Sequence, residues 1–199
     1  HDISDPLSPV LLSEYLLSSG DVNTEFVVSN GFVAAYHNYF HSGQIGTVKV
    51  IDCTDPSSPV LETYGFNTDI LDLQLVGNQI LAVNKYAYPE EPRIGSFESL
   101  SRSGQLLPTT QIMFENPDNN FDGGILGPMV IKDNLAILPA YFGNYSVSSL
   151  CVIDIADPEL PSVVGSIAIP TSLNRSVSTA TDGNRLYSVS GFDAKLRIY

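Results

Sequence analysis

One segment of this sequence recurs, and its spacing constrains the fold more than any other feature. It reads Val-Ile-Asp-Cys-Thr-Asp-Pro-Ser-Ser-Pro-Val-Leu over 50–61 and Val-Ile-Asp-Ile-Ala-Asp-Pro-Glu-Leu-Pro-Ser-Val over 152–163. A partial copy, Asp-Ile-Ser-Asp-Pro-Leu-Ser-Pro-Val-Leu, occupies 2–11. The leading aspartates stand at positions 2, 52 and 154, so one copy is missing near 103; residues 97–112 supply a degenerate one with two apolar runs and a proline. A period of about 50 residues indicates a repeat architecture.

Each period also contains a hairpin pattern, in which two short apolar runs flank a turn rich in Asn, Gly or Asp. The runs are 25–28 with 32–35, 73–76 with 80–83, 129–131 with 135–138, and 176–179 with 186–189. Asn and Gly tolerate the positive φ angles of tight hairpin turns. A third strand is expected at 47–52, 96–100, 149–154 and 194–199, and a fourth at 60–64, 108–114, 162–169 and 10–16.

Four strands in each of four repeats predict an all-β fold, a single β-propeller domain over 1–199 built of four four-stranded antiparallel blades. The repeats cover approximately 2–51, 52–100, 101–153 and 154–199. We expect the N-terminal strand 10–16 to pair beside 194–199 and complete the last blade, which removes two exposed edges. An equally serious alternative is a four-blade segment of a larger propeller, since Tyr199 stands where another Asp-Pro turn is expected.

The repeated Val-Ile-Asp-x-x-Asp-Pro-x-x-Pro-x-Val unit resembles the LVIVD repeat of bacterial and archaeal surface or secreted proteins predicted to be propellers. The match is good over 52–61, 154–163 and the N-terminal partial unit, and poor over 97–112. The resemblance implies an extracellular or cell-surface location, and it implies no substrate.

The composition excludes several partners. The chain has 199 residues, and its 22 acidic against 9 basic residues give a net charge of −13. This charge disfavours nucleic acid and anionic membrane surfaces, because both require basic contacts. No apolar run approaches the ~20 residues of a spanning helix, so membrane insertion is not expected. The chain opens His1-Asp2 without a signal peptide, which we expect to be removed or encoded outside this sequence.

The recurring aspartates and the two cysteines both invite a functional interpretation. The Asp pairs 2/5, 52/55 and 154/157 suggest acid/base dyads, but a catalytic pair is not expected in triplicate. We expect them to accept backbone N–H bonds in turns that proline stabilises. Cys53 and Cys151 belong to blades two apart, so we expect two buried thiols in place of a disulfide.

Aromatic residues follow the second strand of every repeat and make the connections to the third strands the candidate binding loops. Exposed Tyr beside Asn, Glu and Asp suits a glycan or a protein partner. The alternative is that these side chains fold inward and seal the axis. The candidate ligand-binding residues are Tyr36, His37, Tyr39, Tyr86, Tyr88, Tyr141 and Tyr145.

One connection carries a partial calcium-loop pattern. Asp118, Asn120 and Asp122, followed by Gly123, fit the first half of D-x-N-x-D-G, in which alternating oxygens converge on one ion. The twelfth position is Met129 where a complete loop has a bidentate Glu. The alternative is a polar turn. The candidate Ca²⁺ site comprises Asp118, Asn120, Asp122 and Gly124.

These features favour a non-catalytic extracellular binding or scaffold module that presents one loop face to a glycan or protein. One alternative is an enzyme with a metal or polar site at the mouth of the axial channel, for which the first strands offer Glu25, Asp69 and Asp72. Another is a structural subunit of a surface assembly, and fold alone does not decide among the three.

Overall fold

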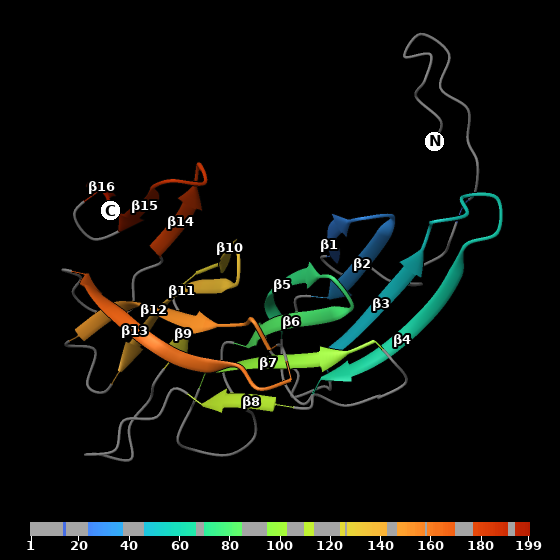
Figure 1. Ribbon diagram of the computed structural model, residues 1–199, viewed down its shortest axis with the longest axis horizontal. Helices are drawn as coiled ribbons and strands as arrows, with labels where there is room; N and C mark the ends of the chain where they lie inside the picture. The colour runs from blue at the N-terminus through green and yellow to red at the C-terminus, as the bar shows by residue number, and fades with distance from the viewer. Residues whose placement is uncertain are drawn as a thin grey trace, which may run out of the picture.

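The protein is an all-β assembly of four antiparallel sheets that follow one another along the chain (Figure 1). The computed structural model describes residue 14 and residues 24–37, 46–66, 70–84, 95–102, 110–113, 124–125, 127–142, 147–157, 159–169, 177–190 and 194–199. No helix occurs in these ranges, so none of the residues within them forms an apolar helix that could cross a bilayer.

Each sheet is built from strands in sequence order. The first contains β1 (Thr24–Ser29), β2 (Phe32–His37), β3 (Gly46–Asp52) and β4 (Val60–Phe66). The second contains β5 (Ile70–Val76), β6 (Gln79–Asn84), β7 (Ser96–Ser101) and β8 (Thr110–Met113). The third contains β10 (Val130–Lys132), β11 (Leu135–Phe142), β12 (Val147–Asp154) and β13 (Ser162–Ile169), and β9 (Gly124–Ile125) pairs with β11. The fourth contains β14 (Val177–Thr181), β15 (Leu186–Ser190) and β16 (Leu196–Ile198).

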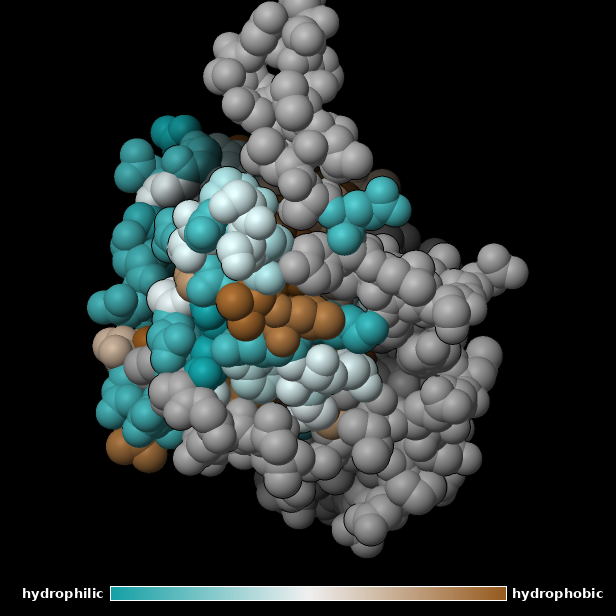
Figure 2. Space-filling model, turned by 90° about the vertical axis from the view of Figure 1, so that its right-hand side faces the viewer, coloured by the Kyte–Doolittle hydropathy of each residue, from teal (hydrophilic) through white to brown (hydrophobic). Residues whose placement is uncertain are grey.

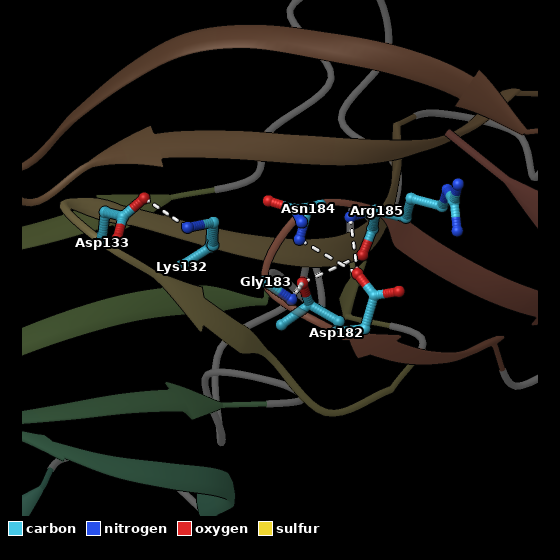
Figure 3. Close-up of polar contacts among 7 residues, drawn as sticks. Lys132, Asp133, Asp182, Gly183, Asn184 and Arg185 are labelled. Atoms are coloured by element: carbon cyan, nitrogen blue, oxygen red, sulfur yellow. Dashed lines mark hydrogen bonds and ion pairs between the residues drawn. The ribbon is translucent and has the colours of Figure 1, made fainter.

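The predicted hairpins are confirmed, and their turns have the expected backbone conformations. Asn30 and Gly31 both have positive φ, as do Gly77, Asp133 and Gly183. In the fourth hairpin, Asp182 Oδ1 accepts hydrogen bonds from the backbone N–H of Asn184 (3.0 Å) and Arg185 (2.9 Å). Figure 3 shows this turn together with the turn of the third hairpin, where Lys132 Nζ and Asp133 Oδ2 form an ion pair of 2.6 Å. Side chains at these turns therefore satisfy backbone groups that the strands leave unpaired.

Two of the three recurring aspartate pairs occupy the turns between third and fourth strands, as predicted, and the pair Asp2 and Asp5 lies outside the described residues. Asp52 Oδ1 accepts from the N–H of Thr54 (2.9 Å), and Asp55 Oδ1 accepts from the N–H of Ser57 (3.0 Å). Asp154 and Asp157 accept from the N–H groups two residues further on in the same way. Hydrogen bonds from Thr54 lower the pKa of the Asp52 carboxyl. These four carboxylates therefore stabilise turns.

The degenerate repeat lacks the Asp-Pro sequence but keeps a backbone hydrogen bond that the regular repeats form at the same place. Arg102 N donates to Asn78 O (2.9 Å), as Cys53 N donates to Gly31 O and Ile155 N to Asn134 O in the regular repeats. Arg102 also lies with its guanidinium carbon 3.6 Å from the centre of the Phe32 ring, a cation–π contact that joins the second sheet to the first.

Neighbouring sheets pack face to face through three apolar cores. Phe66 and Ile80 belong to the core between the first and second sheets, and Phe97 and Leu138 to the core between the second and third. Leu150 and Val177 belong to the core between the third and fourth. In Figure 1 the four sheets follow an arc, with the first at its right end and the fourth at its left. Among the described residues, no apolar core joins the fourth sheet to the first.

The two end sheets of the arc leave apolar side chains in solvent. On the first sheet, Phe26, Val28, Val60 and Leu61 are exposed, and Figure 2 shows an apolar patch on this side of the molecule among polar residues. On the fourth sheet, Val189, Leu196 and Ile198 are exposed. Val163, Val164 and Ile167 on β13 of the third sheet are exposed as well, so exposed apolar side chains are not confined to the ends of the arc.

Three details differ from the sequence predictions. Gly124 and Ile125 form the short strand β9, where a continuous loop was expected. β16 begins at Leu196 and not at Ala194, because Ala194 has a positive φ of 53° that an extended strand cannot contain. Both cysteines are free, as predicted, but only Cys151 is buried, and Cys53 is half-buried. Burial raises the pKa of the Cys151 thiol to about 11.

Candidate functional site

The first strands of the four sheets all begin at one end of the molecule. The carboxylates of Glu25 on β1 and Asp72 on β5 lie close enough to interact electrostatically. Asp72 Oδ2 accepts a hydrogen bond of 2.8 Å from Met129 N, just before β10. Thr179 Oγ1 on β14 donates a bond of 3.0 Å to Pro128 O. These contacts place the starts of β1, β5, β10 and β14 side by side.

The connections from second to third strands leave from this same end. In the first and fourth sheets, the start of the first strand pairs with the end of the second, as Glu25 does with Tyr36 and Val177 with Ser190. Ile70 pairs with Asn84 in the second sheet. Tyr141, near the end of β11, pairs with Gly124 on β9 in the third sheet. The ends of β2, β6, β11 and β15 therefore lie at one end, which we call the loop end. The turns at 30–31, 77–78, 133–134 and 182–185 lie at the opposite, turn end.

Tyr36 anchors the loop end from inside. Its side chain is 2% exposed, and its hydroxyl donates a hydrogen bond of 2.8 Å to Glu25 Oε2. Burial, this hydrogen bond and the charges of Asp72 and Glu25 raise the pKa of Tyr36, so the phenol remains protonated. For Tyr36 the inward-folded alternative applies, because a buried ring with an engaged hydroxyl cannot stack on a ligand. The expectation that it is exposed was wrong.

Asp72 ties the second sheet to the third. It is 8% exposed, and burial raises the pKa of its carboxyl above the ordinary value, although the N–H groups of Met129 and Leu73 act in the opposite direction. The side chain serves as the acceptor for a buried backbone N–H on another sheet. Such a group costs about 1–3 kcal/mol when it loses its partner.

Two substitutions of Asp72 distinguish the contribution of its hydrogen bond to stability from the contribution of its charge. Asp72→Ala is expected to lower the free energy of unfolding by about 1–3 kcal/mol, because Met129 N–H loses its acceptor. Asp72→Asn retains an acceptor oxygen and removes the buried charge, so it should be as stable as the parent, or more stable, at pH 7. Urea unfolding followed by circular dichroism measures both, and equal losses in the two variants would contradict the role of the bond.

Because the pKa of Asp72 is raised, the difference in stability between the parent and Asp72→Asn should depend on pH. A carboxyl whose folded pKa lies above its unfolded value of about 3.9 costs stability as pH rises from near 4 through the folded pKa. The stability of Asp72→Asn relative to the parent should therefore increase over that window and decrease in more acidic buffer. A difference that does not change with pH would show that the pKa of Asp72 is the same in the folded and unfolded states, which would contradict the raised value.

The structure brings two other predicted residues together and leaves most of them untested. Tyr141 on β11 lies directly opposite Gly124 on β9, so one candidate ligand-binding residue and one candidate Ca²⁺ ligand are paired in the backbone register. His37 ends β2 opposite Thr24. The remaining candidates lie outside the described residues: Tyr39, Tyr86, Tyr88, Tyr145, Asp118, Asn120, Asp122 and, from the enzyme alternative, Asp69.

A buried polar cluster at the loop end of the second sheet was not anticipated. Asn84 Nδ2 on β6 donates to Ser96 Oγ (3.1 Å), and Ser96 Oγ donates to Glu98 Oε1 (3.2 Å), both on β7. All three side chains are at most 1% exposed. β7 is buried on both faces, with Leu100 in one core and Phe97 in the next, so every polar residue of this strand is buried whichever face it occupies.

The described groups at the loop end act as structural hydrogen-bonding partners. Tyr36 is a donor to Glu25, and Asp72 is an acceptor from Met129. Within the described ranges, no three side chains of His, Cys, Asp or Glu gather as metal ligands. These residues position the ends of the strands from which the loops depart.

The comparisons with known proteins give no family. No protein-family model matches this chain, and no curated protein matches it in sequence. A chain in a solved S. cerevisiae complex of Dbp5 with Nup159, Gle1, IP6 and ADP is similar at 10% identity and a TM-score of 0.48, over 92% of this chain and 50% of that one. The computationally designed protein Ika8 is similar at 10% identity and a TM-score of 0.40, over 87% and 57%. This chain thus spans about half the length of each.

Proposed function

We propose that these sheets are blades of a β-propeller that acts as a non-catalytic binding or scaffold module. Three observations support the propeller: the sheets follow one another along the chain, each packs on the next, and the first strands begin at one end. The repeat period and the resemblance to LVIVD repeats support it independently, and that resemblance supports an extracellular or cell-surface location.

We place the proposed binding function at the loop end. Connections of variable length and sequence leave a rigid sheet scaffold there, whereas the turn end consists of short turns that their own side chains stabilise. Function concentrates in variable loops that a rigid scaffold positions. Tyr39, Tyr86, Tyr88 and Tyr145 belong to these connections, and aromatic rings beside polar groups suit a glycan or a protein surface.

The described ionisable groups favour binding over the enzyme alternative. Of the three residues offered for an axial catalytic site, Asp72 accepts a hydrogen bond from Met129 N and Glu25 accepts one from the Tyr36 hydroxyl, and Asp69 lies outside the described residues. A group that holds a buried backbone N–H is poorly placed to exchange protons with a substrate. A structural subunit of a surface assembly would have the same sheets, and it would differ from a binding module only in having no ligand that dissociates from it.

A glycan array tests the binding proposal. We expect the purified chain to bind at least one glycan class, and Tyr39→Ser with Tyr88→Ser to weaken that binding tenfold or more, which is about 1.4 kcal/mol. Asn78→Ala, at the turn end, is the matched control and should bind as the parent does. Binding that is lost in the control but kept in the loop variants would refute the assignment to the loop end, and no glycan binding would leave a protein as the partner to be sought.

The candidate Ca²⁺ loop makes a separate prediction. Millimolar CaCl2 should raise the melting temperature by several degrees, because an ion that binds only the folded state at 100 times its Kd adds about 2.7 kcal/mol. Differential scanning fluorimetry with MgCl2 as the control and with Asp118→Asn and Asp122→Asn as variants measures this. An unchanged melting temperature, or a rise that persists in the variants, would contradict Ca²⁺ binding at this loop.

A further inference from the structure

The first sheet exposes apolar side chains at positions that the second sheet buries. Phe26 and Val28 on β1 are 68% and 64% exposed. Their counterparts on β5, counted back from the hairpin turn, are Leu73 and Leu75, which are buried in the core between the two sheets. Val27 packs in the same core, so Phe26 and Val28 on either side of it point away from the second sheet. We call this the leading face, because the second sheet contacts the first with it.

The fourth sheet exposes the opposite face. Leu186 on β15 packs in the core with the third sheet, so the next residue and its cross-strand partner on β16, Ile198, face the other way. Ile198 is 58% exposed, and Leu196, on the same face, is 60% exposed. In the first sheet, the matching strand β3 directs Val48 and Val50 into the core with the second sheet, and both are buried. We call this the trailing face, because the first sheet contacts the second with it.

Position, and not exposure alone, distinguishes these two faces. Val163, Val164 and Ile167 on β13 are exposed too, but they belong to the last strand of the third sheet. The leading face of the first sheet and the trailing face of the fourth are the two halves of the contact that joins neighbouring sheets along the chain. In Figure 1 the two sheets lie at opposite ends of the arc, and no core among the described residues joins them.

We infer that a second copy of this chain covers both faces, so that two four-sheet arcs close into one ring of eight sheets. A second copy supplies both missing halves at once, because its trailing face fits the leading face of the first copy and its leading face fits the trailing face. A two-fold axis through the ring makes the two contacts equal and ends the assembly at two copies. Burial of the apolar side chains drives the association. This inference rests on the propeller arrangement proposed above and does not depend on what binds at the loop end.

The mass of the full chain in solution tests the inference. Size-exclusion chromatography with multi-angle light scattering should give twice the chain mass of 21.5 kDa. Phe26→Glu on the leading face and Ile198→Glu on the trailing face should each raise the dissociation constant of the dimer by about tenfold or more, because each buries a carboxylate without a partner. Val164→Glu is the matched control and should remain a dimer, because Val164 is similarly exposed, at 56%, but lies on neither face.

A mixture of the two face variants tests which faces meet. A ring of one Phe26→Glu chain and one Ile198→Glu chain keeps one contact without a substitution and places both glutamates in the other. The mixture should therefore form dimers at concentrations at which each variant alone is a monomer, and circular dichroism should show that both variants keep the parent's fold. A monomeric parent, a larger open assembly, or a dimer that only one of the two variants weakens would overturn the inference. A monomeric parent that binds a glycan would overturn the ring and leave the binding proposal standing.

Discussion

Replacing Phe97 with alanine is expected to lower the free energy of unfolding by about 3–5 kcal/mol. Phe97 on β7 is fully buried and packs in the core that joins the second sheet to the third, with Leu81, Leu138 and Ile153 among its members. Removal of the ring leaves a cavity between two sheets whose strands cannot close it without losing their own hydrogen bonds. Urea unfolding followed by circular dichroism measures the loss.

Leu160→Ala is the control for the same chemistry in solvent. Leu160 lies before β13 and is 73% exposed, so its truncation should change stability by no more than about 0.5 kcal/mol. A Phe97→Ala variant that unfolds with the parent's midpoint would show that the second and third sheets do not pack through this core.

The second large effect is expected from Gly127→Ala. A Cβ atom at this position would lie 1.9 Å from Val177 O and 3.4 Å from Pro139 Cγ. The first neighbour is backbone, which cannot turn aside as a flexible side chain does, so the fourth sheet would have to move away from the third. Overpacking of this kind costs about 1–3 kcal/mol or more, and the thermal and urea transitions should both move downward.

Gly165→Ala is the matched control. A Cβ at Gly165 on β13 meets nothing within 4 Å, so this change should leave stability unchanged or raise it slightly, because alanine restricts the unfolded chain. Equal destabilisation in both variants would indicate a general sensitivity to glycine replacement and would contradict the close approach at Gly127.

The local elements were predictable because their signals are local. Positive φ at Asn30, Gly31 and Gly183 follows from the residue types, and the hairpins around them occur where the apolar runs placed them. The aspartate turns were predictable for the same reason, since the side chain bonds the backbone two residues away. The strand at 194–199 was predicted too long, because nothing in the residue type of Ala194 indicates a left-handed backbone.

The orientation of the candidate binding residues was harder to predict from the sequence. Tyr36 was expected to be exposed on the strength of its place beside a loop, yet it faces the second sheet, two positions from Ala34 on the same buried side of β2. The alternation of side chains along β2 contained that information, but only the packed neighbour decides which of two faces is buried. The polar cluster of Asn84, Ser96 and Glu98 was missed because buried polar residues resemble surface residues in a sequence.

The sequence by itself determined the repeat period, the order of strands within each sheet and the chemistry of the turns, because these depend on residues close together in the chain. The tertiary structure alone decided that Asp72 would hold Met129 of another sheet, and that Gly127 would lie against Val177. These contacts join residues 50 or more positions apart. Their partners depend on how whole sheets pack, and packing responds to shape and volume that no local pattern records.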